Sequence, residues 1–196
     1  LFRSGNYANF NLYLNKEQDY QALFGVVGSA GSVQKLSVTG QIYGSNNIGS
    51  VVGLNHGTIS EVYSTAQVYA NNNVGGIIGA NHGSLSITYF RGEVDGNNYI
   101  GGITGLNSGT ILESYNTAKV FGNSFVGYIS GNNTGTSTNS YYTTNLIDSK
   151  NKSNKLVPNG AFENTIDNES SKAVNQDMLY SISSNLLSEV YWLEKQ

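Results

Sequence analysis

Hydrophobic and polar residues in this chain follow one pattern, which is written four times between positions 49 and 144. Aligned on their glycines, the copies read GSVVGLNHGTISEVYSTAQVYANNNV (49–74), GGIIGANHGSLSITYFRGEVDGNNYI (75–100), GGITGLNSGTILESYNTAKVFGNSFV (101–126) and a shorter GYISGNNTGTSTNSYYTT (127–144). An earlier copy from Gly25 to Ile48 fits with a short deletion after Gly28. A fixed period of this length is typical of a structural unit that buries its apolar face only by stacking on its neighbours.

Each copy contains three short runs rich in Val, Ile, Thr and Tyr, separated by Gly and Asn. In the first full copy these runs are residues 48–52, 58–63 and 66–69. Their composition favours strands, while each glycine would cost a helix about 1 kcal/mol. Three strands per period predict one turn of a solenoid. We therefore expect an all-β protein, a right-handed parallel β-solenoid of about five 26-residue coils, with copies stacked at about 4.8 Å.

Equivalent positions then form columns along the stack, and four apolar columns are expected to point inward. They are Ile48, Val74, Ile100 and Val126; Val51, Ile77, Ile103 and Ile129; Ile59, Leu85 and Ile111; and Val68, Val94 and Val120. The column of Gln67, Glu93 and Lys119 changes its chemical character between copies, as is typical of positions that face solvent.

The corners between strands are predicted from Asn and Gly. One column of asparagines should form a ladder in which each side-chain amide bonds to the next; it consists of Asn55, Asn81, Asn107 and Asn133. Two positions later comes a column of glycines, expected to be turns with positive φ; it consists of Gly57, Gly83, Gly109 and Gly135.

A column of tyrosines is the candidate binding surface; it consists of Tyr63, Tyr89, Tyr115 and Tyr141. The alternation of strand residues leaves its direction open. Counting by twos from Ile59 places the tyrosines inside. Counting back from Val68 places them outside, as an exposed ribbon, with Val62 and its equivalents inside.

Three regions follow from where the repeats begin and end. Residues 1–24 are expected to be N-terminal capping strands, including an alternating run at 10–14, and residues 25–144 the solenoid. Residues 145–196 should form a linker, at 145–155, and a C-terminal cap. Residues 171–183 carry apolar side chains at helical spacing, which predicts a helix that covers the strand edges at the end of the stack.

Composition excludes several classes of partner. Only 12% of the 196 residues are charged, the net charge is −3, and the ten basic residues are scattered, so we expect no binding to nucleic acid. No apolar run is long enough to span a bilayer. The chain has no cysteine, which fits a bacterial surface protein but also many cytosolic ones. Leu1 and Gln196 look like cut points in a longer protein.

Residues that could carry chemistry are sparse. His56 and His82 share a column and could bridge a metal ion, but zinc sites usually have three or four ligands, so we expect no metal and no cofactor. The paired carboxylates of a glycosidase lie about 5–9.5 Å apart. Glu61 and Glu113 would lie two coils apart, near 10 Å. Glu93 and Asp95 share one face of a strand, but no general base, arginine or aromatic subsite can be identified near either pair. The acidic loop at 95–98 lacks the spacing of known calcium motifs.

The phrase G-hydrophobic-hydrophobic-G-x-N-x-G-T-I, followed by Y-x-T-A-x-V, resembles the GLUG repeat, seen in residues 52–55 and 104–107. The resemblance covers Gly25 to about Thr144. It implies a module of a bacterial surface protein, as in adhesins of the filamentous-haemagglutinin type and the zinc metallopeptidases that cleave immunoglobulin A. In those peptidases such repeats lie upstream of the catalytic region. Ala80 and Asn132 depart from the pattern's leucine.

The resemblance implies a non-catalytic, monomeric recognition or scaffold module, secreted or attached to the cell wall, which would grip a host glycoprotein such as immunoglobulin A or a neighbouring domain. A spacer or ligand-binding segment of an adhesin is the alternative. A carbohydrate-active β-helix is a third hypothesis, with Glu61, Glu93, Asp95 or Glu113 as candidate acids. An ice-binding surface is not supported, because Thr65, Arg91 and Thr117 do not make a threonine array.

Overall fold

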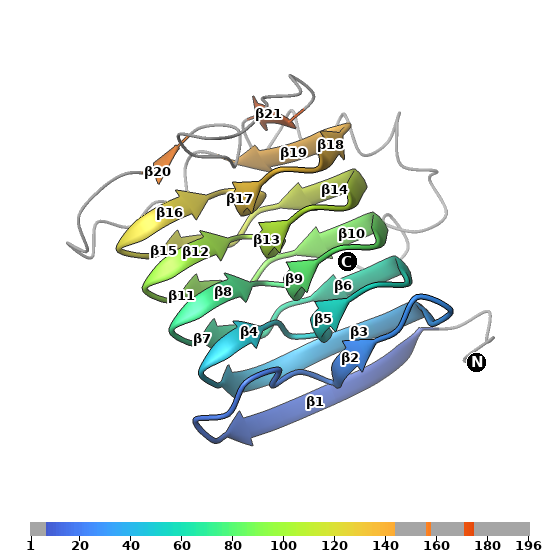
Figure 1. Cartoon of the computed structure of the whole chain (residues 1–196), viewed down its shortest axis with the longest axis vertical. Helices are drawn as coiled ribbons and strands as arrows, with labels where there is room; N and C mark the ends of the chain where they lie inside the picture. The colour runs from blue at the N-terminus through green and yellow to red at the C-terminus, as the bar shows by residue number, and fades with distance from the viewer. Residues whose placement is uncertain (1–6, 144–155, 158–170, 175–196) are drawn as a thin grey trace.

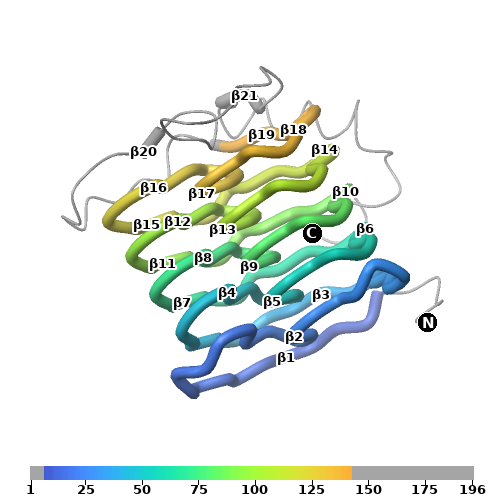
Figure 2. Tube along the Cα trace, viewed as in Figure 1, coloured from blue at the N-terminus to red at the C-terminus, as the bar shows by residue number. Residues whose placement is uncertain are grey.

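The computed structural model describes residues 7–143, 156–157 and 171–174. These residues form strands and connecting turns and contain no helix. The chain rises coil by coil with a right-handed sense, and each strand lies beside its equivalent in the next coil (Figures 1 and 2). The prediction of a parallel β-solenoid of about five coils is confirmed.

Three parallel sheets make up the walls of the solenoid. The largest holds β1 (Ala8–Asn15), β3 (Ser32–Tyr43), β6 (Thr58–Ser64), β7 (Gln67–Tyr69), β10 (Ser84–Phe90), β11 (Glu93–Asp95), β14 (Thr110–Asn116), β15 (Lys119–Phe121), β18 (Thr136–Thr138), β19 (Ser140–Thr143) and β21 (Ser171–Val174). The second holds β4 (Asn46–Ile48), β8 (Asn72–Gly75), β12 (Asn98–Gly101), β16 (Ser124–Gly127) and β20 (Leu156–Val157). The third holds β2 (Phe24–Val27), β5 (Val52–Asn55), β9 (Ile78–Asn81), β13 (Thr104–Asn107) and β17 (Ser130–Asn133).

The register of the sheets follows the sequence period without slippage. Val74 pairs with Ile48 on one side and with Ile100 on the other. Tyr89 pairs in the same way with Tyr63 and Tyr115. A shift of one residue would turn every apolar side chain of a strand toward solvent, so burial of the core fixes this register.

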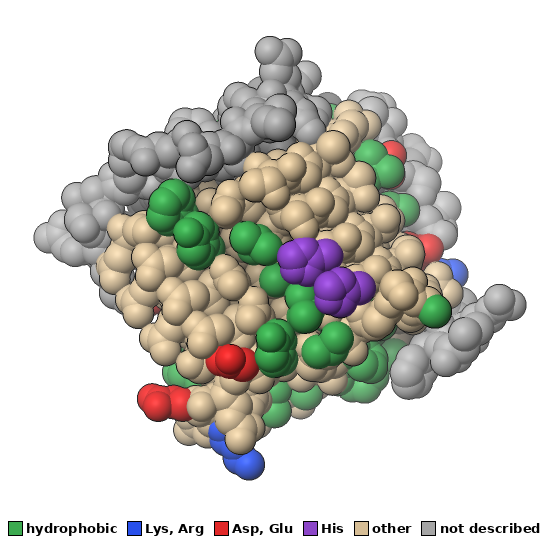
Figure 3. Space-filling view, in the orientation of Figure 1, with side chains coloured by type: hydrophobic (Ala, Val, Ile, Leu, Met, Phe, Trp, Pro, Cys, Tyr) green, Lys and Arg blue, Asp and Glu red, His purple; other side chains and the backbone are tan. Residues whose placement is uncertain are grey.

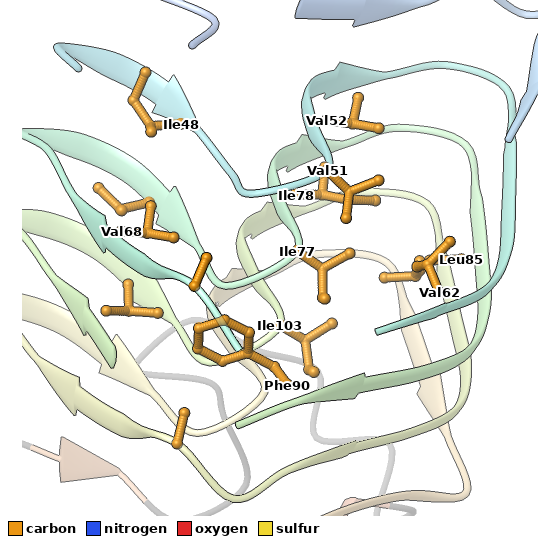
Figure 4. Packing of buried hydrophobic residues seen from close by; sticks show 14 of the residues in the cluster. Ile48, Val51, Val52, Val62, Val68, Ile77, Ile78, Leu85, Phe90 and Ile103 are labelled. Carbon is orange, nitrogen blue, oxygen red and sulfur yellow. The ribbon is translucent and has the colours of Figure 1, made fainter. Parts of the chain in front are cut away.

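The core is a thin column of aliphatic side chains between the three walls (Figure 4). All four apolar columns predicted to point inward are buried, each residue at 3% exposure or less. Phe90 is fully buried beside these columns and lies opposite Gly76, where a Cβ atom would come within 2.3 Å of its ring. Glycine at position 76 therefore gives Phe90 its space.

Each coil has one residue with a left-handed backbone conformation in the region of its longest strand. This residue explains why counting alternate positions could not decide whether the tyrosines face inward or outward. Residues of this column have φ near +50°; they are Lys35, Glu61, Ile87, Glu113 and Asn139. Such a residue interrupts the two-residue alternation of a strand. Both Ile59 and Val62 consequently face the core, and Tyr63 faces outward, as the second way of counting has it.

The N-terminal end is closed by a strand that precedes the repeats. β1 pairs in parallel with β3, and its Phe10, Leu12 and Leu14 pack against the core. This confirms the strand predicted at residues 10–14. Residues 18–20 continue the stack below β4, since the backbone N–H of Tyr20 donates to the carbonyl of Asn46 at 2.9 Å.

The C-terminal region differs from the prediction where the structure describes it. Ser171–Val174, the predicted start of a helix, form strand β21, which pairs in parallel with β19. The reason is the open edge of β19, whose backbone groups find partners in an added strand and not in a helix. β20 extends the second sheet beyond β16 in the same way. The linker at 145–155 and the rest of the predicted helix lie outside the described residues.

Candidate functional site

The asparagine column forms the predicted ladder, and it is buried. Each side-chain amide donates to the side-chain oxygen one coil further on, at 2.8, 2.8 and 2.7 Å from Asn55 to Asn133. The oxygen of Asn55 also accepts the backbone N–H of Gly57 at 2.9 Å. All four residues are at most 5% exposed. The ladder therefore supports the corner and offers no surface to a ligand.

The glycine column lies at the same corners, but the prediction that these glycines have positive φ is wrong. Among the described glycines, only Gly40 has a φ in the left-handed region, at 107°. The requirement for glycine is close approach: a Cβ atom at Gly57, Gly83, Gly109 or Gly135 would lie 2.0–2.2 Å from a glycine carbonyl oxygen of the preceding coil. Apart from Gly40, the described residues with positive φ are not glycines and lie at other positions of the coils.

The tyrosine column faces away from the core but is not an exposed ribbon. Tyr63 and Tyr89 are half-buried, whereas Tyr115 and Tyr141 are 8% and 9% exposed. The rings of Tyr89 and Tyr115 stack at 4.2 Å, and that of Tyr7 lies 5.7 Å from the ring of Tyr63. Burial raises the pKa of Tyr115, and the neighbouring Tyr89 and Tyr7 add to this rise. These four residues therefore offer a partner much less surface than predicted.

A different side of the solenoid carries no acidic or basic side chains other than histidine. The segments that form its second and third sheets in four successive coils are 46–57, 70–83, 96–109 and 122–135, and none contains Lys, Arg, Asp or Glu. Figure 3 shows this side: acidic and basic side chains lie at its margins, and the histidines lie near its middle. The acidic and basic residues of the repeats belong to the opposite sheet or to the connections between its strands. Glu61, Glu93 and Lys119 lie in strands, and Arg91 lies between β10 and β11.

The uncharged side carries its own ladders of amides and rings, which sequence reasoning missed. Exposed Asn123 donates to Asn97 at 2.9 Å, and half-buried Asn98 donates to Asn72 at 2.9 Å. The rings of Tyr99 and Phe125 stack at 4.7 Å beside them. Tyr99 and Phe125 have φ of 59° and 52°, so their backbone turns both side chains outward. The sequence signal for these ladders was a pair of polar residues that recurs in each copy, at 71–72, 97–98 and 123–124, directly before Asn73, Tyr99 or Phe125.

The two histidines lie at a corner of this uncharged side, after β5 and β9. Both are exposed, and their rings stack with centroids 5.1 Å apart at an interplanar angle of 17°. Nδ1 of His82 is hydrogen-bonded to the hydroxyl of Ser108, the next residue of the column. Partial desolvation of the ring lowers the pKa of His82, and the positive charge that His56 can carry lowers it further.

The carboxylates considered for catalysis are held by different neighbours. Glu61 lies 3.9 Å from the ammonium group of Lys35, and Glu93 accepts the hydroxyl of Tyr69 at 2.9 Å. Burial raises the pKa of Tyr69, with further contributions from Glu93. Within residues 7–143 and the two short strands that follow, no three His, Cys, Asp or Glu side chains gather into a potential metal centre.

Comparison with protein-family models, with curated proteins and with solved structures finds no match for this chain. A search of the described residues for a helix of bilayer-spanning length and hydropathy found none.

Proposed function

We propose that this chain is a rigid recognition or scaffold module of a secreted or cell-surface bacterial protein, built from GLUG-like repeats. The observation that supports it most directly is the separation of the two sides of the stack. Four coils repeat an uncharged surface of amides and rings on one side, while the charged residues of the repeats lie on the other. Solenoids of this kind hold repeated side chains at a fixed spacing over an extended surface.

The partner proposed is a host glycoprotein such as immunoglobulin A, or a neighbouring domain of the same protein. The uncharged side suits such a partner because each amide in a ladder uses one N–H and one oxygen lone pair, which leaves a second donor and a second acceptor for a ligand. Tyr99 and Phe125 add apolar area beside those groups, and aromatic residues contribute much of the binding energy at interfaces.

A binding experiment with two matched variants tests this proposal. Immunoglobulin A is immobilised, and the chain is passed over it as wild type, with Tyr99→Ala and Phe125→Ala together, or with Tyr63→Ala and Tyr89→Ala together. The first variant is expected to weaken binding at least tenfold and the second to have less effect. Binding lost only in the second variant would place recognition on the tyrosine column. No binding by the wild-type chain would remove immunoglobulin A as a partner.

A spacer in an adhesin is the second candidate. It is favoured by the column in which Gln67, Glu93 and Lys119 pair across successive coils, because free change of charge at one position is typical of side chains that face solvent. If the chain retains no protein or glycan from a matrix-protein and glycan panel, the spacer function is supported over recognition.

A further inference from the structure

The chain has two histidines and no cysteine among its 196 residues, and the fold brings both imidazoles together. His56 and His82 stand one coil apart, with ring centroids separated by 5.1 Å and planes within 17° of parallel. Both side chains are exposed at the corner that follows β5 and β9. The stack thus places the two imidazoles of the chain next to each other.

The next residue in the column helps to orient His82. Ser108 is hydrogen-bonded to Nδ1 of His82, and a serine hydroxyl can either donate or accept such a bond. When Nδ1–H donates to Ser108, the lone pair is on Nε2, away from the hydrogen bond. Histidines that bind metals almost always have their other ring nitrogen occupied in this way.

We propose that His56 and His82 bind a divalent transition metal ion of the type that prefers imidazole, Zn²⁺ or Cu²⁺. Nε2 of each ring would be a ligand, and water would complete the coordination shell. With metal–nitrogen distances of about 2.1 Å, tetrahedral coordination needs the two nitrogens about 3.4 Å apart. Both rings lie at the surface, where their side chains can rotate. In the complex the rings would leave the parallel stack, because the lone pair of each Nε2 has to point at the metal ion.

The surroundings favour a metal ion over a proton at this site. Neutral imidazole is the form that binds metals. The corner segments 46–57, 70–83 and 96–109 contain no carboxylate that could form an ion pair with a protonated ring. The lack of thiolates anywhere in the chain removes the softer ligands that would otherwise take Zn²⁺ or Cu²⁺ first.

Because the chain has two imidazoles, histidine NMR signals report directly on the site. Zn²⁺ is titrated into the whole chain at pH 7.5, with ¹⁵N-labelled histidine observed and the affinity measured by calorimetry. Both imidazoles are expected to shift together and to saturate at one ion per chain. His56→Asn and His82→Asn should each weaken the affinity at least tenfold, because two linked ligands bind more tightly than one.

The control is Asn97→Ala, on the same uncharged side, which should leave the affinity unchanged. Circular dichroism checks that each variant keeps its strand signal. The proposal is overturned if the two imidazoles of the wild-type chain shift independently or not at all. It is also overturned if either single-histidine variant binds Zn²⁺ as tightly as the wild type.

Discussion

The side-chain amide of Asn81 donates a hydrogen bond of 2.8 Å to the side-chain oxygen of Asn107, one full coil further along the chain. Asn81 in turn accepts from Asn55 at 2.8 Å and is fully buried. An amide side chain has both a donor and an acceptor, so a single residue type can continue such a ladder through every coil. Hydrogen bonds between side chains therefore connect the coils in addition to those of the backbone.

Replacing Asn81 with alanine should destabilise the solenoid by about 1–3 kcal/mol, because it removes the hydrogen bonds that join its buried side chain to Asn55 and Asn107. Asn97→Ala is the matched control: it removes a rung of a ladder at an exposed corner and should change stability by less than about 0.5 kcal/mol. Urea unfolding followed by circular dichroism measures both. Equal losses in the two variants would contradict a special role for the buried ladder.

Adding a methyl group at Gly83 should be more damaging than its size suggests. A Cβ atom there would lie 2.1 Å from the carbonyl oxygen of Gly57, which belongs to the backbone of the preceding coil. Since a backbone cannot move aside as a side chain can, Gly83→Ala should cost about 1–3 kcal/mol or more. Gly28→Ala provides the comparison, because no atom lies within 4 Å of its added Cβ. A similar midpoint of thermal unfolding for both variants would refute this explanation of the glycine column.

Tyr128 should make the protein sensitive to alkali. Its side chain is 4% exposed and its ring stacks on that of Tyr142 at 4.4 Å. Burial, together with Tyr142, raises the pKa of Tyr128 to about 12, whereas an unfolded tyrosine ionises near pH 10. Between these values the unfolded chain binds fewer protons than the folded one, so stability falls as the pH rises, by roughly 1.4 kcal/mol per pH unit for such a group.

The measurement is urea unfolding between pH 9 and 11.5 for the wild type and for Tyr128→Phe. The phenylalanine variant keeps the stacked ring and lacks the ionising hydroxyl, so its stability should decline less steeply above pH 10. Identical slopes for the two proteins would show that Tyr128 ionises as readily in the folded state as in the unfolded one.

His82 should respond to acid in the opposite direction. Burial and then His56 lower its pKa below the usual 6.5, so the unfolded chain binds more protons than the folded one in the interval below pH 6.5. Stability should therefore decrease as the pH falls from 6.5 through the pKa of the folded state. In EDTA, an NMR titration should give a pKa for His82 that rises in His56→Asn but stays below 6.5, because burial is the larger cause. An unchanged pKa would mean that His56 exerts no influence.

Much of this architecture could be predicted from the sequence because the repeat forces like residues to stack. The column of Val68, Val94 and Val120 is buried as expected, since parallel strands in register place equivalent positions side by side. The ladder from Asn55 to Asn133 followed from the same argument, because a side chain with both a donor and an acceptor can bond to its own equivalent in the next coil.

Other features depended on the backbone, which the pattern of side chains does not reveal. Glu61, Ile87 and Glu113 share a left-handed φ near +50° although their chemistry differs, and this turn decides that Tyr63 faces outward. The outward aromatic pair of Tyr99 and Phe125 depends on a similar turn. Neither residue type favours that conformation, so no local propensity could have indicated it.

The sequence by itself determined the period, the strands, the inward columns and the absence of charge from one side of the coils. The tertiary structure decided which groups come into contact. Gly83 is needed because the carbonyl of Gly57 lies next to it. Tyr115 is buried, and Ser171–Val174 add a strand beside β19. The physical reason is the same in each case. Periodicity fixes which residues are equivalent, whereas contact distances and strand edges arise only when whole coils are placed on one another.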